Sequence, residues 1–212
     1  MRLTVFGASG GIGGQVVRQA LDLGYAVTAV VRDPSAFAIR HPALDVLTVP
    51  GLTDPEPLRP ALKDSDAVIS GVGPRGRKDG PVASRATRGI LQAMRDTGVA
   101  RLVVVSAAPV GPLPPGDSWL NRVLVFRMIG ALLRDTYLDL AEMEAQIRDS
   151  GTQWTVVRPP KLVDKPLTGR YRTVLGGNVP RGYTISRADV AHYLLVALAD
   201  PATVGQPVGI AY

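Results

Sequence analysis

Cysteine is absent from this 212-residue sequence, and histidine is nearly so. Without cysteine the chain can form no disulfide, no thiolate metal site and no thiol nucleophile. His41 and His192 are its only histidines, which leaves few of the usual ligands for a zinc or iron centre. We therefore expect no metal site and no thiol chemistry.

Long apolar runs are also scarce. The most apolar stretch, residues 119–133, is interrupted by Asn121, Arg122 and Arg127. It is too short and too charged to span a bilayer. The N-terminal residues lack the charged region, apolar core and small-residue cleavage site of a secretory signal. We therefore expect a cytoplasmic protein with no membrane partner.

Aromatic residues make up only 5% of the chain, although the formal net charge is +6. Recognition of nucleic acids usually needs a basic face, a known module or interleaved aromatic side chains. Apart from a short basic segment at residues 75–78, the positive charges are scattered along the sequence. We expect no nucleic-acid partner; a solvated surface and a basic rim around a polyanionic cofactor both account for the excess charge.

What the sequence does contain is a regular alternation of strand-like and helix-like segments. The expected strands are residues 3–6, 26–31, 44–49, 67–70, 101–105 and 154–157, and the expected helices are residues 12–23, 82–97, 119–148 and 187–199. This order predicts an α/β fold, a Rossmann-type doubly wound parallel sheet with helices on both faces. We expect a single domain over residues 1–212, with a small C-terminal lobe of about residues 159–212 that contributes to the substrate site.

A glycine-rich loop joins the first expected strand to the first expected helix. It consists of Gly7, Ala8, Ser9, Gly10, Gly11, Ile12 and Gly13. In such loops one glycine permits a sharp turn, others let backbone N–H groups approach a pyrophosphate, and the last lets the helix pack closely on the sheet. The helix N-terminus adds unsatisfied donors and a positive partial charge. The loop therefore predicts a dinucleotide site.

The end of the second expected strand indicates which dinucleotide binds. NAD-specific folds usually place an acid here to hold the ribose hydroxyls, and Asp33 lies at about that distance. Arg32 comes first, however, and its guanidinium is suited to a 2′-phosphate. We expect NADP(H) to be preferred over NAD(H).

Segments along nearly the whole chain carry a family resemblance. They are residues 7–10, 24–33, 66–69 and 106–107, and most specifically residues 157–171 and 185–190. In these segments the chain resembles the atypical short-chain dehydrogenase/reductases, in particular the flavin reductase and biliverdin reductase B family.

The resemblance implies roles for individual residues. It assigns the 2′-phosphate to Arg32 and places Ser106 near the nicotinamide and the substrate. The residues implied to bind cofactor are the glycine loop, Arg32, Leu52, Thr53, Val72, Gly73, Pro74, Arg75, Ser106, Pro159 and Pro160. Ser106 and Lys161 are the expected catalytic residues, and Ala107 and Pro109 are expected substrate contacts. Trp119 and Phe126 do not come from the resemblance: they lie in the apolar helical stretch, where an acceptor pocket, a dimer surface and core packing all fit them, and we expect them to contact the substrate.

The chain also departs from its relatives. Lys161 stands where the family has a histidine, Leu52 stands where relatives often carry an aspartate near the adenine, and Ala36 replaces a second basic residue near the 2′-phosphate. The tyrosine–lysine acid of conventional short-chain dehydrogenases is missing, because Tyr137 is followed four residues later by Ala141. A carbonyl reductase or a nucleotide-sugar epimerase would need that pair.

Two functions fit these residues. The first is an NADPH-dependent oxidoreductase that transfers hydride to a flavin-like, quinone-like or linear tetrapyrrole acceptor, with flavin as an exchangeable substrate rather than a prosthetic group. The second is a non-catalytic NADP(H) redox sensor on the same scaffold, like the NmrA-type regulators. We expect a small aromatic acceptor as partner, and a monomer or homodimer.

Overall fold

The computed structural model describes residues 1–74, 79–112 and 119–212, with only the helical backbone described over residues 119–132. Within these residues the main sheet has eight strands in the order β3-β2-β1-β4-β5-β6-β10-β8. They are β1 (Arg2–Phe6), β2 (Ala26–Val31), β3 (Leu44–Thr48), β4 (Ala67–Ser70), β5 (Arg101–Val105), β6 (Gln153–Arg158), β8 (Arg172–Leu175) and β10 (Gln206–Ala211). The strand pairs are parallel except for β8, which runs antiparallel to β10. The predicted Rossmann-type sheet is confirmed.

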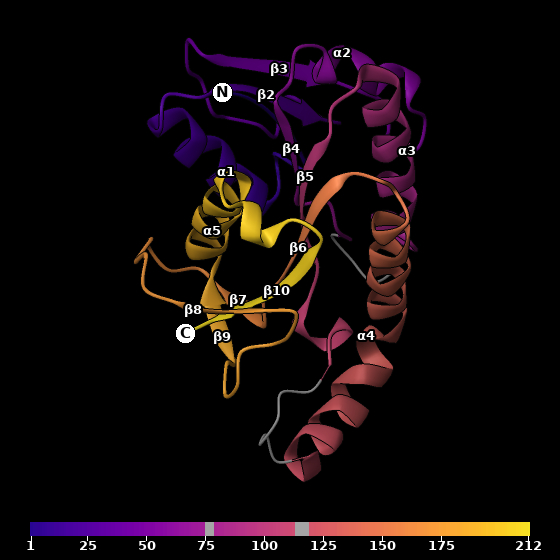
Figure 1. Cartoon of the computed structure of the whole chain (residues 1–212), viewed down its shortest axis with the longest axis vertical. Helices are drawn as coiled ribbons and strands as arrows, with labels where there is room; N and C mark the ends of the chain where they lie inside the picture. The colour runs from indigo at the N-terminus through magenta and orange to yellow at the C-terminus, as the bar shows by residue number, and fades with distance from the viewer. Residues whose placement is uncertain (75–78, 113–118) are drawn as a thin grey trace.

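Helices cover both faces of the sheet (Figure 1). On one face α1 (Gly11–Asp22) packs against α5 (Arg187–Ala199), and on the other α3 (Val82–Thr97) packs against α4 (Trp119–Arg148). A single-turn helix, α2 (Arg59–Leu62), lies beside α3. Strand side chains alternate between the two layers: Val5 is buried in the α1 and α5 layer, and Phe6 in the α3 layer. Burial on both faces explains why the central strands read as continuous apolar runs.

Side chains or glycines cap an end of most of the long helices. Gly98 ends α3 in the left-handed conformation with φ of 77°. Ser186 accepts a hydrogen bond from the Asp189 amide and so begins α5. The first amides of α3 donate to the buried Asp139 of α4. In α1 the N-terminal cap is Gly10, which has no side chain to offer. The first turn of α1 therefore keeps donors for a ligand.

The C-terminal part of the chain is divided between two sheets. Residues 159–212 supply β8 and β10 to the main sheet, whereas β7 (Lys161–Val163) and β9 (Thr184–Ser186) form a separate parallel pair. Strand β7 was not predicted, because three residues after a proline pair carry almost no periodicity. The division of the chain into one domain and a C-terminal lobe remains a prediction.

Candidate functional site

A cavity of about 490 Å³ opens at the carboxyl ends of β1, β2 and β4. Phe6 at the end of β1 pairs with Val30 of β2 and with Ser70 of β4, so the residues after all three strands meet at one edge. The strand order reverses here, which is where doubly wound sheets bind ligands. The residues that line the cavity include ten that were predicted to bind cofactor: Gly7, Gly10, Gly11, Ile12, Arg32, Leu52, Thr53, Val72, Gly73 and Pro74.

The glycine loop forms the floor of this cavity, and its packing leaves no room for a side chain at Gly7 or Gly13. Gly7 has φ of +74°, and a Cβ on it would lie 2.9 Å from the carbonyl carbon of Gly71. A Cβ on Gly13 would lie 2.1 Å from the Gly7 carbonyl oxygen. Gly10 and Gly11 instead face the cavity. A pyrophosphate fits this cradle, since its oxygens would meet bare backbone and the uncapped first turn of α1.

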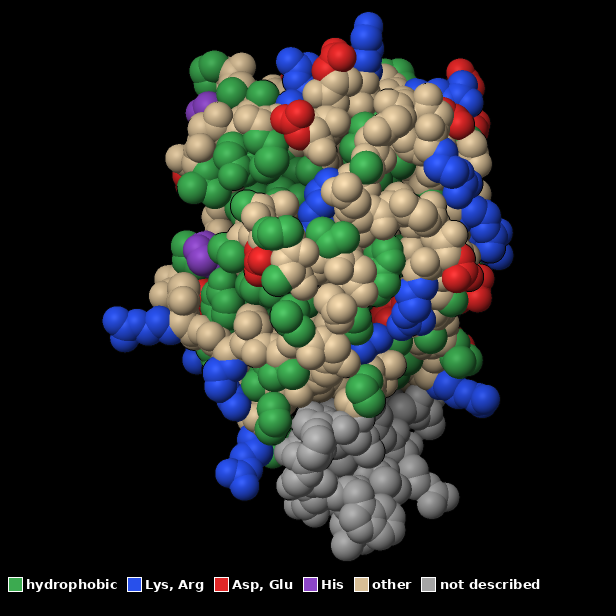
Figure 2. Space-filling view, in the orientation of Figure 1, with side chains coloured by type: hydrophobic (Ala, Val, Ile, Leu, Met, Phe, Trp, Pro, Cys, Tyr) green, Lys and Arg blue, Asp and Glu red, His purple; other side chains and the backbone are tan. Residues whose placement is uncertain are grey.

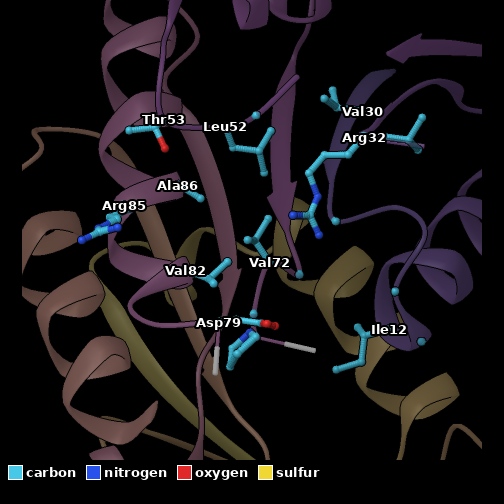
Figure 3. A pocket seen from close by; sticks show the side chains of 18 of the residues that line it. Ile12, Val30, Arg32, Leu52, Thr53, Val72, Asp79, Val82, Arg85 and Ala86 are labelled. Carbon is cyan, nitrogen blue, oxygen red and sulfur yellow. The ribbon is translucent and has the colours of Figure 1, made fainter. Parts of the chain in front are cut away.

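Arg32 and Asp33 take different positions at the end of β2. The Arg32 side chain lines the cavity, and its guanidinium points inward toward Val72 (Figure 3). The Asp33 carboxylate accepts hydrogen bonds from the amide and hydroxyl of Ser35, at 2.9 and 2.6 Å, and so closes the following turn. The ambiguity in the sequence is thereby reduced: the cation faces the cavity and the acid has local partners.

Further charged residues surround the cavity. Arg85 of α3 and Arg187 of α5 line it, with Asp79 as the acid in the described lining. Figure 3 shows the Arg85 side chain directed away from the cavity. On the face seen in Figure 2, basic side chains are distributed over several places rather than gathered in one patch. Arg32 and Arg187 bring positive charge to the cavity itself.

One side of the cavity depends on a close approach between a loop and a helix. Leu52 and Thr53 follow β3, and a Cβ on Gly89 of α3 would lie 2.2 Å from the Leu52 carbonyl oxygen. Gly89 therefore lets α3 pack directly against this loop and holds it at the cavity. No feature of the sequence points to this role, because an interior glycine in a helix has many explanations.

Other residues predicted from the sequence do not line this cavity. Ala8 and Gly13 are buried beneath the loop, and Ser9 is partly buried within it. Ala107 and Pro109 are partly buried after β5. Arg75 and the side chains of Trp119 and Phe126 lie outside what the structure describes. The roles of these residues stay predictions.

Ser106 is buried in an ionic network instead. Its hydroxyl donates to the Glu144 carboxylate at 2.7 Å. The same carboxylate accepts from Arg158 Nε at 2.9 Å and from Arg148 at 2.7 Å. Glu144 and Arg158 are both buried, so the pair ties α4 to β6. A carboxylate held by two arginines acts as a hydrogen-bond acceptor. The hydroxyl proton of Ser106 is therefore donated to Glu144, and the serine oxygen can only accept further hydrogen bonds.

The segment after β6 also lies apart from the cavity. Pro159 is buried, and its carbonyl accepts from the Ala108 amide at 2.9 Å. Pro160 borders a separate small cavity with Arg158 and Asn178. Lys161 is exposed, and the next residue, Leu162, is the one that reaches the main cavity. Cofactor binding by Pro159 and Pro160 stays a prediction.

Tyr137 does not replace the missing acid. Its ring packs against the core on the α3 side, and burial raises the pKa of its hydroxyl. A conventional catalytic tyrosine needs a lowered pKa instead.

The described residues also bear on metal binding and on membranes. Among them there is no cluster of histidine, aspartate or glutamate that could hold a metal ion. None of the described helices is both long and apolar enough to cross a membrane.

Several residues that line the cavity are not predicted from the sequence. They are Val30, Val31, Pro50, Gly51, Gly71, Asp79, Pro81, Val82, Arg85, Ala86, Leu162 and Arg187. Those that follow β2, β3 and β4 could have been found from the rule that strand ends meet at one edge. Arg187 could not, because the sequence does not reveal that α5 packs against α1.

Two relatives match most of this chain in sequence. An uncharacterized chloroplastic protein of Arabidopsis thaliana is 31% identical over 79% of this chain, which spans 61% of the plant protein. A UPF0659 protein of Schizosaccharomyces pombe is 28% identical over 92% of this chain and 83% of its own length. The chain thus covers about three fifths of the plant relative.

Solved structures share the whole fold. A short-chain dehydrogenase/reductase of Veillonella parvula, in complex with NADP, superposes with a TM-score of 0.83 at 18% identity, over 100% of this chain and 94% of that one. The oxidoreductase ylbE of Lactococcus lactis gives a TM-score of 0.78 at 17% identity, over 100% and 90%.

A family model provides the assignment. It is described as NAD(P)H-binding, and it matches residues 7–201, from the first glycine of the loop to the end of α5 and just beyond. The match therefore includes the residues that form the cavity floor and both of its walls. On this evidence, together with the glycine cradle, the chain belongs to the NAD(P)H-binding family.

Proposed function

We propose that the chain is an NADP(H)-dependent reductase whose cofactor lies in the cavity above the glycine loop. The observation that carries the proposal is the arrangement at the end of β2, where Arg32 points into the cavity and Asp33 is held by Ser35. A guanidinium at this place suits the 2′-phosphate, which NAD(H) lacks. The NADP complex of the Veillonella parvula structure, on the same fold, supports this choice.

The residues present favour an acceptor that needs no protonation by a tuned acid. A reduced nicotinamide bound here would supply a hydride. A flavin or quinone spreads the resulting charge over a conjugated ring, whereas a simple ketone needs a proton at once. Tyr137 is partly buried, and Ala141 stands four residues later, where conventional enzymes carry a lysine. Binding and orientation of the acceptor therefore have to provide the rate acceleration. Flavin-like, quinone-like and tetrapyrrole acceptors fit this requirement.

One observation favours a second candidate, the NADP(H) sensor. The hydroxyl of Ser106, the implied catalytic serine, donates to Glu144, and the side chain does not border the cavity. A serine whose hydroxyl already donates to a buried carboxylate suits a structural role, and a regulator on this fold would need that role as well. The sensor would bind NADPH as tightly as the reductase does but transfer no hydride.

Steady-state NADPH oxidation distinguishes the two candidates. The purified protein is assayed at 340 nm with flavin mononucleotide, riboflavin, a quinone and biliverdin, each against a reaction without acceptor and one without protein. The reductase predicts a colourless protein that oxidises NADPH only when an acceptor is present. Tight NADPH binding without turnover on any acceptor would support the sensor instead.

A further inference from the structure

Arg187, at the first position of α5, lies directly over the glycine loop. A Cβ built on Gly11 would lie 2.7 Å from Arg187 Cδ and 2.9 Å from its Nε. These two residues are far apart in sequence and meet because α5 packs along α1. Arg187 also lines the main cavity together with Gly10 and Gly11. Its side chain therefore occupies the wall beside the first turn of α1.

The guanidinium of Arg187 is held at one end and open at the other. Nη1 donates to Asp164, the residue after β7, at 2.6 Å. Within the described part of the chain, Nε and Nη2 have no hydrogen-bond partner, and the side chain is 32% exposed. An arginine fork can bind a carboxylate through one nitrogen and an anion through the others. Of these open donors, Nε lies next to Gly11 of the glycine loop.

We propose that Arg187 is a second phosphate-binding residue, which contacts the pyrophosphate of the cofactor, and that Asp164 positions it. This inference rests on the proposed dinucleotide site. The pyrophosphate oxygens would lie over Gly10 and Gly11, within reach of the side chain that already covers Gly11. Arg32 and Arg187 then divide the anionic groups between them: Arg32 binds the 2′-phosphate, and Arg187 the pyrophosphate that NADPH and NADH share.

This division gives a test by calorimetric titration of the full chain with NADPH, NADH and ADP. The substitution Arg187→Ala should weaken all of them by a similar factor of about 10 to 100, the scale of a charge-assisted hydrogen bond. AMP, which lacks the second phosphate, should lose less. Arg170→Ala is the matched control, since Arg170 is an exposed residue of the same lobe and does not line the cavity.

Two further variants separate the contact from general damage. Arg187→Lys keeps the charge without the fork and should recover part of the affinity. Asp164→Asn should weaken binding only about two- to fivefold, since exposed ion pairs contribute little. Unfolding midpoints of all variants should match the wild-type value.

Several outcomes would overturn the inference. Unchanged affinity in Arg187→Ala removes the contact, and a loss confined to NADPH makes Arg187 a 2′-phosphate residue instead. Tighter binding in Asp164→Asn contradicts the positioning role, because the acid would then compete with the cofactor. Failure of the wild-type protein to bind any dinucleotide would instead refute the proposed function.

Discussion

At the scale of single residues, Arg32 determines the cofactor in this account. Replacing it with alanine should weaken NADPH binding by about 1.5–3 kcal/mol, the range for a hydrogen bond to a charged group, and leave NADH nearly unchanged. Dissociation constants from cofactor fluorescence titrations measure this directly. Ala36→Arg is an informative companion: a second cation near the expected 2′-phosphate should tighten NADPH alone. Equal losses with both cofactors in Arg32→Ala would remove the 2′-phosphate assignment.

The network around Ser106 leads to a second prediction at this scale. Ser106→Ala removes one neutral donor to a carboxylate that keeps two arginines, so it should cost about 1 kcal/mol of unfolding free energy. Glu144→Gln leaves the buried Arg158 without its counter-charge and should cost about 3 kcal/mol or more. Chemical denaturation measures both values. A similar small cost for the two variants would mean that the ion pair does not hold α4 to β6.

Activity measurements test the role of Ser106 independently of stability. If its oxygen orients the nicotinamide or the acceptor by accepting a hydrogen bond, Ser106→Ala should lower kcat and leave NADPH affinity nearly intact. Normal turnover with several acceptors would make Ser106 a structural residue.

At the scale of elements, the contact between α3 and the loop after β3 depends on Gly89. Alanine is the better helix former by about 1 kcal/mol, so propensity alone predicts that Gly89→Ala stabilises the protein. Its Cβ, however, would lie 2.2 Å from the Leu52 carbonyl oxygen and 2.8 Å from that of Thr53. Overpacking against backbone costs about 1–3 kcal/mol, so the steric effect should win.

Thermal unfolding and NADPH titration together check this prediction. Gly89→Ala should lower the midpoint and weaken NADPH binding, because the displaced loop lines the cavity. Arg95→Ala is the control, since Arg95 is an exposed residue of α3 that does not line the cavity. A stabilised Gly89→Ala protein with normal affinity would show that the loop moves away at no cost.

The start of α5 gives a pH-dependent prediction. Burial by itself raises the pKa of Asp189, but hydrogen bonds from Tyr212, Thr168, Gly169 and Ser186 lower it, and the net pKa is below the ordinary value. A lowered pKa in the folded state stabilises the protein above the unfolded-state pKa of about 4, and the contribution is lost as pH falls through the folded-state value.

Replacement of Asp189 by asparagine therefore should cost most at neutral pH. There the amide nitrogen of the new side chain would face donors that now meet a carboxylate. The difference in unfolding free energy from wild type should shrink as the pH falls toward 3, as urea unfolding at several pH values would reveal. A difference that stays constant with pH would mean that the pKa of Asp189 is the same in the folded and unfolded states.

At the scale of the whole molecule, the fold followed from the sequence to a large extent. Valine-rich strands such as residues 26–31 and 101–105 are buried on both faces, and that pattern is visible along the chain. The glycine loop and the cation at position 32 are likewise recognisable in the sequence as features of a dinucleotide site. These features are local, so spacing and residue type reveal them.

Contacts between distant segments were not predictable in this way. Arg187 reaches the glycine loop only because α5 packs on α1, and Ser106 meets Glu144 only because α4 packs against β6, the neighbour of β5. Strand β7 was missed because its three residues carry no period. A single sequence contains no direct information on such pairings, which depend on how the layers pack.

The central claim is that the cavity above the glycine loop is a site for NADP(H). It is tested most directly by isothermal titration of the wild-type protein with NADPH and with NADH in the same buffer. If Arg32 binds the 2′-phosphate, NADPH should bind more tightly by about tenfold or more. Equal affinities, or tighter binding of NADH, would contradict the account.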